Sequence, residues 1–243
     1  MPLLWPIVRK ALSDIWEEAF YLALFNMLWV AGAVPGLLLI TYGVQGPFLG
    51  LVLLGLLALV PWPFVTFGLF HTAHEIDQGK AIGLKTFFRG GRQRWRQAYL
   101  WGGLNALIVA VLLANIRFYS SPISPLGNTS LGTMLSAFFA SLTLLWLLWQ
   151  LMVLTIYPRL ETPGLRLALR NAAILMLAQP LPVVFVGFLA LVLGLTAFVV
   201  PLLGFLSNFA LIAVLANRAT TEILNQEEKR REALKKRDSD GRR

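Results

Sequence analysis

The chain has 243 residues, of which 57% are hydrophobic, only 14% are charged, and none is cysteine. A soluble domain carries about 25% charged residues, so this chain has too few charges to cover a water-facing surface. Several of its apolar runs approach the ~20 residues that a helix needs to cross a bilayer. The composition therefore predicts a membrane protein, and it excludes a soluble enzyme, a nucleic-acid-binding module and a disulfide-stabilised fold.

In chain order, the apolar runs predict an all-α, polytopic transmembrane helical bundle of six spans. The predicted spans are residues 20–41, 48–70, 98–117, 133–157, 174–193 and 198–216. The domain organisation is then an N-terminal amphipathic cytoplasmic segment at 1–19, a six-helix transmembrane domain at 20–217 and a charged cytoplasmic tail at 218–243. Segment 1–19 is too long and too acidic for the short basic leader of a signal peptide, so we expect no cleavage.

The distribution of Lys and Arg predicts which side of the membrane each loop faces. All of them except Arg117 lie in the two terminal segments and in loops 71–97 and 158–173. The loops that alternate with these contain none. Six spans with both termini in the cytoplasm place every basic segment on one side, as the positive-inside rule requires.

Two of the basic loops contain a similar segment. Residues 83–89 align with residues 164–170, with apolar residues at the same three positions and two cations four residues apart. On a helix this spacing gives one apolar stripe with a basic flank. We therefore expect amphipathic cytoplasmic helices that lie in the headgroup layer. An internal duplication and a chance similarity both remain open, because the match is short.

The first of these segments continues into an aromatic and basic stretch. Gly90 and Gly91 are expected to break its helix. Its cations could serve only to set topology during insertion, or the segment could be a docking face on which aromatic side chains fill the groove of a partner. The candidate partner or lipid contacts are Lys85, Phe87, Phe88, Arg89, Arg92, Trp95 and Arg96.

The polar residues inside the predicted spans are amides rather than charges. The absence of intramembrane carboxylates argues against a proton- or sodium-coupled transporter. Amides in lipid cost free energy unless they pair across helices, so we expect interhelical hydrogen bonds. A polar lining for a solute such as a sugar is the alternative. The candidate residues for either role are Asn26, Asn105, Gln150 and Asn208.

His71, His74 and Glu75, with Asp77 nearby, are the weak candidates for a metal site, because a short helix could present the first three to one ion. Their order does not match His-Glu-x-x-His or its inverse. Polar residues are also what normally ends a span. We therefore predict no metal and no other cofactor. No nucleophile triad or phosphate-binding loop is present in the sequence, so we expect no enzymatic activity.

Four short motifs resemble the YesL-like family of bacterial integral membrane proteins, whose function is unassigned. The motifs are Asn26–Trp29, Pro63–Gly68, Phe87–Ala98 and Arg170–Ala172. The chain departs from the family pattern in that residues 36–62 intervene between the first two motifs. The resemblance implies a protein of the bacterial inner (plasma) membrane that is encoded beside sugar-uptake transporters.

These observations favour a non-catalytic accessory or regulatory partner of a transporter for carbohydrate uptake. The expected partners are the lipid bilayer and transporter subunits, with no nucleic acid. The alternative is a small solute transporter or channel in its own right, acting as a homo-oligomer.

Overall fold

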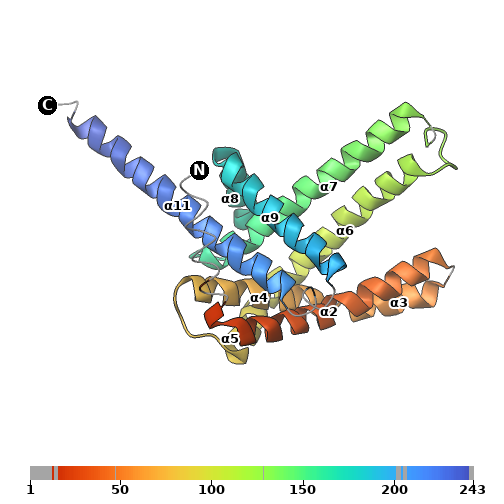
Figure 1. Cartoon of the computed structure of the whole chain (residues 1–243), viewed down its shortest axis with the longest axis horizontal. Coiled ribbons are helices and arrows are strands. Elements are labelled where there is room, and N and C mark those ends of the chain that lie inside the picture. The colour runs from red at the N-terminus through yellow and green to blue at the C-terminus, as the bar shows by residue number, and fades with distance from the viewer. Residues whose placement is uncertain are drawn as a thin grey trace.

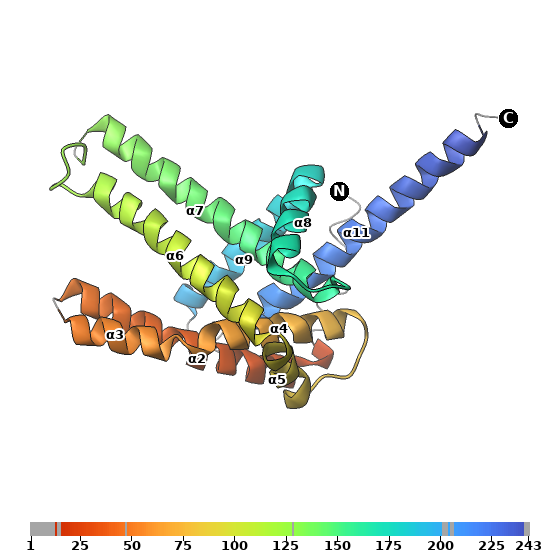
Figure 2. The same cartoon turned by 180° about the vertical axis from the view of Figure 1, so that it is seen from behind.

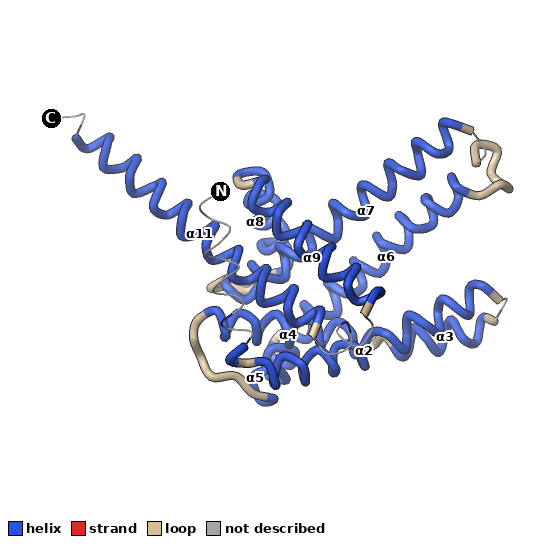
Figure 3. The backbone as a smooth tube through the Cα atoms, viewed as in Figure 1, coloured by secondary structure: helices blue, strands red, loops and turns tan. Residues whose placement is uncertain are grey.

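The computed structural model describes residues 13, 16–46, 48–127, 129–200, 204 and 207–240. Within these residues the chain is helical apart from short loops, and it contains no strand (Figure 3). The helices are α2 (Ala19–Gln45), α3 (Leu49–Ala58), α4 (Pro61–Asp77), α5 (Leu84–Gln93), α6 (Trp95–Ser120), α7 (Ser130–Ile156), the 3-10 helix η1 (Tyr157–Arg159), α8 (Leu165–Ala178), α9 (Pro180–Val199) and α11 (Asn208–Asp240). The predicted all-α class is confirmed.

Five helical segments among the described residues are long and apolar enough to cross a membrane. They are Ala19–Gln45, Leu49–Asp77, Trp95–Ser120, Ser130–Arg159 and Pro180–Ala197. Their outer surfaces carry large exposed apolar side chains, for example Leu57 (68%), Leu107 (64%) and Met134 (69%). Apolar surface of this extent is normal against lipid and rare against water. The protein is therefore a multi-pass membrane protein.

The first four predicted spans overlap the first four of these segments, but six spans are not confirmed. Predicted span 174–193 is interrupted at Gln179, where the backbone leaves the helical region (φ −134°, ψ 62°), and α9 begins at Pro180. Proline lacks a backbone N–H donor and is favoured in the first turn of a helix, so it starts α9 instead of continuing α8. Predicted span 198–216 begins at the end of α9 and ends inside α11, and residues 201–203, 205 and 206 lie outside the described part of the chain.

Two long helical hairpins diverge from a common centre. One is formed by α2 with α3 and the other by α6 with α7, and their tips lie on the same side of the molecule in both views (Figures 1 and 2). At the centre, α4 packs against α2, α5, α6 and α11. The core there is built from side chains of many helices, including Phe25, Leu69, Phe87, Met152 and Val214. The far end of α11 projects away from the hairpin tips (Figure 1).

Glycines allow α2 and α3 to pack in direct backbone contact. A Cβ atom on Gly36 would lie 2.6 Å from Cγ of Leu59 and 2.8 Å from the carbonyl oxygen of Gly55. A Cβ on Gly55 would lie 2.8 Å from the carbonyl oxygen of Gly36. Small residues at such positions are the usual means of close helix approach in membranes, where dispersion forces drive helix association.

Glycines also seat α5 on α4, which corrects the expectation that Gly90 and Gly91 break the helix. Both lie inside α5 and are buried. A Cβ on Gly90 would lie 2.5 Å from Cβ of His71, and one on Gly91 would lie 2.8 Å from the carbonyl oxygen of Phe64. The helix is interrupted instead at Arg94 (φ −129°, ψ 27°), directly before α6.

The two similar segments form helices in the same register. α5 and α8 each begin one residue after a glycine with extended backbone, Gly83 (φ −176°) and Gly164 (φ −145°). Phe87 and Ala168, which align with each other, are both fully buried. The sequence similarity therefore extends to helix start and orientation, and each helix joins two longer apolar ones.

Candidate functional site: a buried ion cluster

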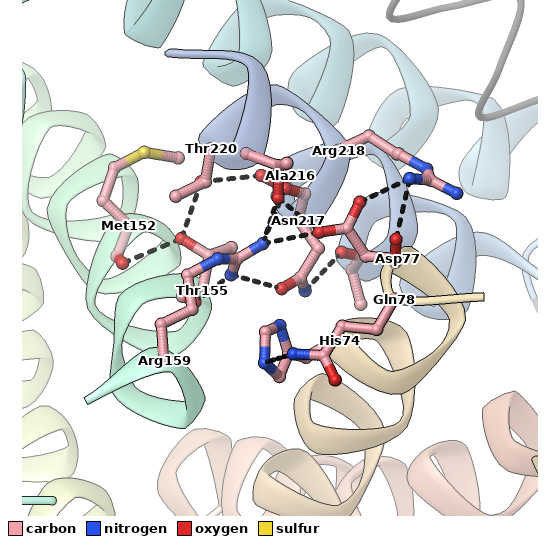
Figure 4. Close-up of polar contacts among 12 residues, drawn as sticks. His74, Asp77, Gln78, Met152, Thr155, Arg159, Ala216, Asn217, Arg218 and Thr220 are labelled. Carbon is pink, nitrogen blue, oxygen red and sulfur yellow. Dashed lines mark hydrogen bonds and ion pairs between the residues drawn. The ribbon is translucent and has the colours of Figure 1, made fainter. Parts of the chain in front are cut away.

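A cluster of charged and polar side chains lies where α4 ends, where α7 passes into η1, and in the first half of α11 (Figure 4). We call it the ion cluster and define it by Asp77, Arg159, Asn217, Arg218 and Thr221. These side chains are contributed by segments up to 144 residues apart in sequence. Their contacts join the end of α4 and the end of α7 to α11.

Asp77 is the single acidic member of the ion cluster. Its Oδ1 atom lies 2.7 Å from Nη1 of Arg218, and its Oδ2 atom lies 3.0 Å from Nη2 of Arg159. Thr221 donates a further hydrogen bond to Oδ2, and Arg218 also donates to the backbone oxygen of Asp77 at 2.9 Å. The Asp77 side chain is only 4% exposed, so these donors replace the water that it would otherwise bind.

Arg159 uses its guanidinium group to join α11 to α7. Besides Asp77, it donates to Oδ1 of Asn217 at 2.7 Å, to the backbone oxygen of Asn217 at 3.0 Å, and to the backbone oxygen of Thr155. The hydroxyl of Thr220 donates to that of Thr155 at 2.9 Å beside it. A planar guanidinium suits this geometry, because it presents five donors in fixed directions.

The negative charge of Asp77 is essential to the stability of the ion cluster, because it compensates two buried positive charges. Two guanidinium groups, with side chains 13% and 9% exposed, share this carboxylate. Removing one partner from a buried pair leaves a charge without compensation, which is far more costly than losing an exposed pair. The Asp77 carboxylate is occupied by these donors, and the arrangement holds α11 against α4 and α7.

Sequence reasoning treated Arg159 and Arg218 only as charges that set topology, and Asp77 only as a neighbour of the histidines. The sequence signal that could have identified this cluster is the position of the three residues at the ends of apolar segments. Arg159 and Arg218 are each the first charge after an apolar helix segment, and Asp77 ends another. Residues in these places lie at similar depth in a membrane, so they are candidates to pair.

The three metal candidates His71, His74 and Glu75 each contact a different part of the protein. Gln78 donates to Nε2 of His74 at 2.8 Å, and Glu75 forms an ion pair with Lys80 at 3.2 Å. His71 packs toward α5 and lines a small cavity of about 10 Å³, with space for about one water molecule. Within the described residues, no three His, Cys, Asp or Glu side chains are placed to hold one metal ion.

Two of the four predicted intramembrane amides lie together. Asn105 on α6 donates to Oε1 of Gln150 on α7 at 3.2 Å, and Trp101 donates to the same oxygen at 2.9 Å. Trp146 donates to Oδ1 of Asn105 at 3.0 Å. Asn105 and Gln150 are 4% and 3% exposed. These hydrogen bonds join α6 to α7 and engage three of the four polar atoms of the two amides.

The other two amides lie at a different place, where α11 begins. Oδ1 of Asn26 accepts hydrogen bonds from the backbone N–H groups of Phe209 at 2.8 Å and Ala210 at 3.2 Å. Nδ2 of Asn26 donates to the backbone oxygen of Gly204 at 3.1 Å. Asn26 therefore satisfies N–H groups that the first turn of a helix leaves without a partner. Asn208 is buried beside this site.

The predicted lipid or partner contacts divide into two groups. Phe87 is fully buried and stacks on Phe25 with ring centroids 4.8 Å apart, so it belongs to the core and not to a contact surface. The remaining candidates are all exposed on α5 or on the first turn of α6: Lys85, Phe88, Arg89, Arg92, Trp95 and Arg96. Arg96 lies over the ring of Trp95 at 5.4 Å.

The chain matches no protein-family model, no curated protein and no solved structure.

Proposed function

We propose that the protein is a non-catalytic accessory subunit that connects a membrane transporter to a cytoplasmic element through α11. The resemblance of its short motifs to the YesL-like family is what associates this role with carbohydrate uptake and with the bacterial inner membrane. The observation that supports it most directly is the way in which α11 is held.

The first part of α11 is built into the bundle. Ala210, Ala213, Val214, Asn217 and Ile223 are all buried, and the ion cluster fixes this part to α4 and α7. Farther along, Gln179 donates to Glu227 and ties α11 to the start of α9. Beyond Glu227 the helix projects from the bundle as far as Asp240 (Figures 1 and 2). A force applied to the projecting end is therefore transmitted to the membrane helices.

The projecting part has the composition of a helix that meets water or another protein. Residues 227–240 contain six Lys and Arg, with five Glu and Asp distributed among them. A helix that is polar on every side either bridges to another domain or depends on charge pairs along its own surface. An accessory subunit uses such a helix to reach a partner outside the membrane.

Both termini belong on the cytoplasmic side in this proposal, although the described residues contain five apolar helical segments of spanning length and not six. The first part of α11 runs from Asn208, which lies beside Asn26, to Arg218, which lies beside the end of α4. This part is ~15 Å long at 1.5 Å per residue. That is half of the ~30 Å hydrocarbon core. The end of α9 and the start of α11 both lie nearer the centre of the molecule than the hairpin tips do (Figure 1).

We infer that α9 and the first part of α11 form a re-entrant hairpin that enters the membrane from the cytoplasmic side and turns back within it. Irregular backbone at membrane depth is tolerated only where protein supplies its hydrogen bonds. Asn26 supplies three such hydrogen bonds, to the backbone of Gly204, Phe209 and Ala210. The four remaining segments then cross completely, which returns the chain to the side on which it started and keeps all the basic loops together.

The accessory role is tested by purification from native membranes. A variant that ends at Glu227 keeps the ion cluster and the contact with Gln179, so it should insert and purify at the normal yield. It should lose the transporter subunits that accompany the full-length chain. Retention of those subunits at full-length stoichiometry would contradict the role proposed for α11. Solute flux in liposomes that contain only this protein would support the small-transporter alternative instead.

A further inference from the structure

Helix α5 has a fixed orientation relative to the bundle. Phe87 is fully buried, Gly90 and Gly91 are buried against α4, and Arg94 donates to the backbone oxygen of Tyr157 at 3.3 Å. At about 100° per residue these four positions form one side of the helix. The side chains on its other sides are therefore held in known directions.

The exposed sides of α5 change character in a regular order around the helix. Next to the buried side are Leu84 and Phe88, which are 45% and 46% exposed. The basic side chains follow, and Gln93 lies beyond them. The exposed cations in this middle sector are Lys85, Arg89 and Arg92. Passing around α5 therefore leads from apolar to cationic to neutral polar side chains.

This order matches the layers at a membrane surface. Acyl chains meet apolar side chains, lipid phosphates meet the cations, and water meets the neutral polar side. Trp95 (52% exposed) and Tyr99 (38% exposed) follow α5 directly, and such aromatic residues are enriched at the headgroup level. A groove on a protein partner would not require the three sectors to follow one another in this sequence.

Helix α8 repeats the basic part of the arrangement. Arg166 and Arg170, which align with Lys85 and Arg89, are both exposed. Farther along the same helix Ile174 and Leu177 are 55% and 84% exposed. The exposed side of α8 therefore also combines cations with apolar side chains.

We propose that α5 is a binding surface for the phosphate groups of anionic phospholipids, with Lys85, Arg89 and Arg92 as the phosphate contacts. Leu84 and Phe88 enter the acyl layer beside them. Each cation near an anionic leaflet strengthens binding by about fivefold. Three cations held on one rigid helix give the protein a preference for anionic over zwitterionic lipid. This inference does not depend on the proposed accessory role.

The charge part of the proposal is tested by native mass spectrometry of the full chain after mixing it with phosphatidylglycerol and phosphatidylcholine. The wild type should retain phosphatidylglycerol preferentially. The triple variant Lys85→Gln, Arg89→Gln and Arg92→Gln should bind it one to two orders of magnitude more weakly. A matched variant, Lys229→Gln, Lys235→Gln and Lys236→Gln, removes the same charge from α11 and should change binding by less than twofold. Equal loss in the two variants would overturn the proposal, because net charge alone would then explain retention.

The position of the helix is tested with single cysteines, since the natural chain has none. A fluorescent label on Phe88→Cys should be quenched by a quencher attached to lipid acyl chains, and a label on Gln93→Cys should be quenched by iodide in water. Quenching of both labels by iodide alone would overturn the proposal and leave a site for soluble anions. Protection of the Phe88→Cys label from both quenchers in native membranes would also overturn it, since a protein partner would then cover α5.

Discussion

At the scale of single residues, Asp77 has the largest expected effect. Asp77→Asn keeps the shape of the side chain but removes the counter-charge of Arg159 and Arg218. Breaking a buried ion pair by removing one partner costs about 3–5 kcal/mol. We therefore expect the free energy of unfolding in detergent to fall by about this amount, as measured by denaturant titration.

Glu75→Gln is the matched control, because it changes an acid on the same helix. Glu75 pairs with Lys80, whose side chain is 54% exposed, so its loss should cost no more than about 1 kcal/mol. If Asp77→Asn and Glu75→Gln lowered the free energy of unfolding equally, the ion cluster would contribute no more to stability than an exposed ion pair does.

The ion cluster also marks the limit of what the sequence predicts at this scale. Sequence spacing compares residues within one helix, and it identified His71, His74 and Glu75 because they share a helical face. Asp77 and Arg218 are 141 residues apart, and only the packing of α11 on α4 brings them together. Asn105 and Gln150 were identified individually, but their pairing depends in the same way on how α6 crosses α7.

At the scale of helices, the pattern of apolar runs predicted the four long segments that form the two hairpins. It began the fifth span six residues too early, at residue 174, because apolar composition continues across Gln179 while Pro180 starts a new helix. It also gave Gly90 and Gly91 a helix-breaking role, although buried glycine in a helix serves equally to let another backbone approach. Sequence alone does not distinguish these roles, since both require the absence of a side chain.

The α2–α3 hairpin allows a direct test of this packing role. In Gly55→Ala the new Cβ would lie 2.8 Å from both the carbonyl oxygen of Gly36 and the backbone nitrogen of Ile40, so the two helices must separate. We expect a loss of about 1–3 kcal/mol, the usual cost of overpacking, measured as a lower midpoint of thermal unfolding.

Gly50→Ala is the control in the same helix, because no atom lies within 4 Å of its added Cβ. Alanine is the better helix former by about 1 kcal/mol, so this variant should be neutral or slightly more stable. A lower midpoint in both variants would show that the stability of α3 depends on glycine itself and not on contact with α2.

At the scale of the whole molecule, the number of complete crossings decides where the termini lie. Five crossings would place the ends of the chain on opposite sides, and the basic segment that follows Asn217 would then face outward. Four crossings with a re-entrant α9–α11 hairpin keep every basic segment in the cytoplasm, as the distribution of Lys and Arg favours. The two arrangements differ most at Val199, the last residue of α9.

Single-cysteine labelling in intact cells separates these arrangements. Ile123→Cys at a hairpin tip is 95% exposed and should react with an impermeant maleimide from outside. Lys85→Cys and Lys229→Cys should react only after the membrane is opened. Val199→Cys should react from neither side, because the re-entrant hairpin places this 81% exposed side chain in the hydrocarbon layer, where thiolate does not form. Labelling of Val199→Cys from outside would show instead that α9 crosses completely.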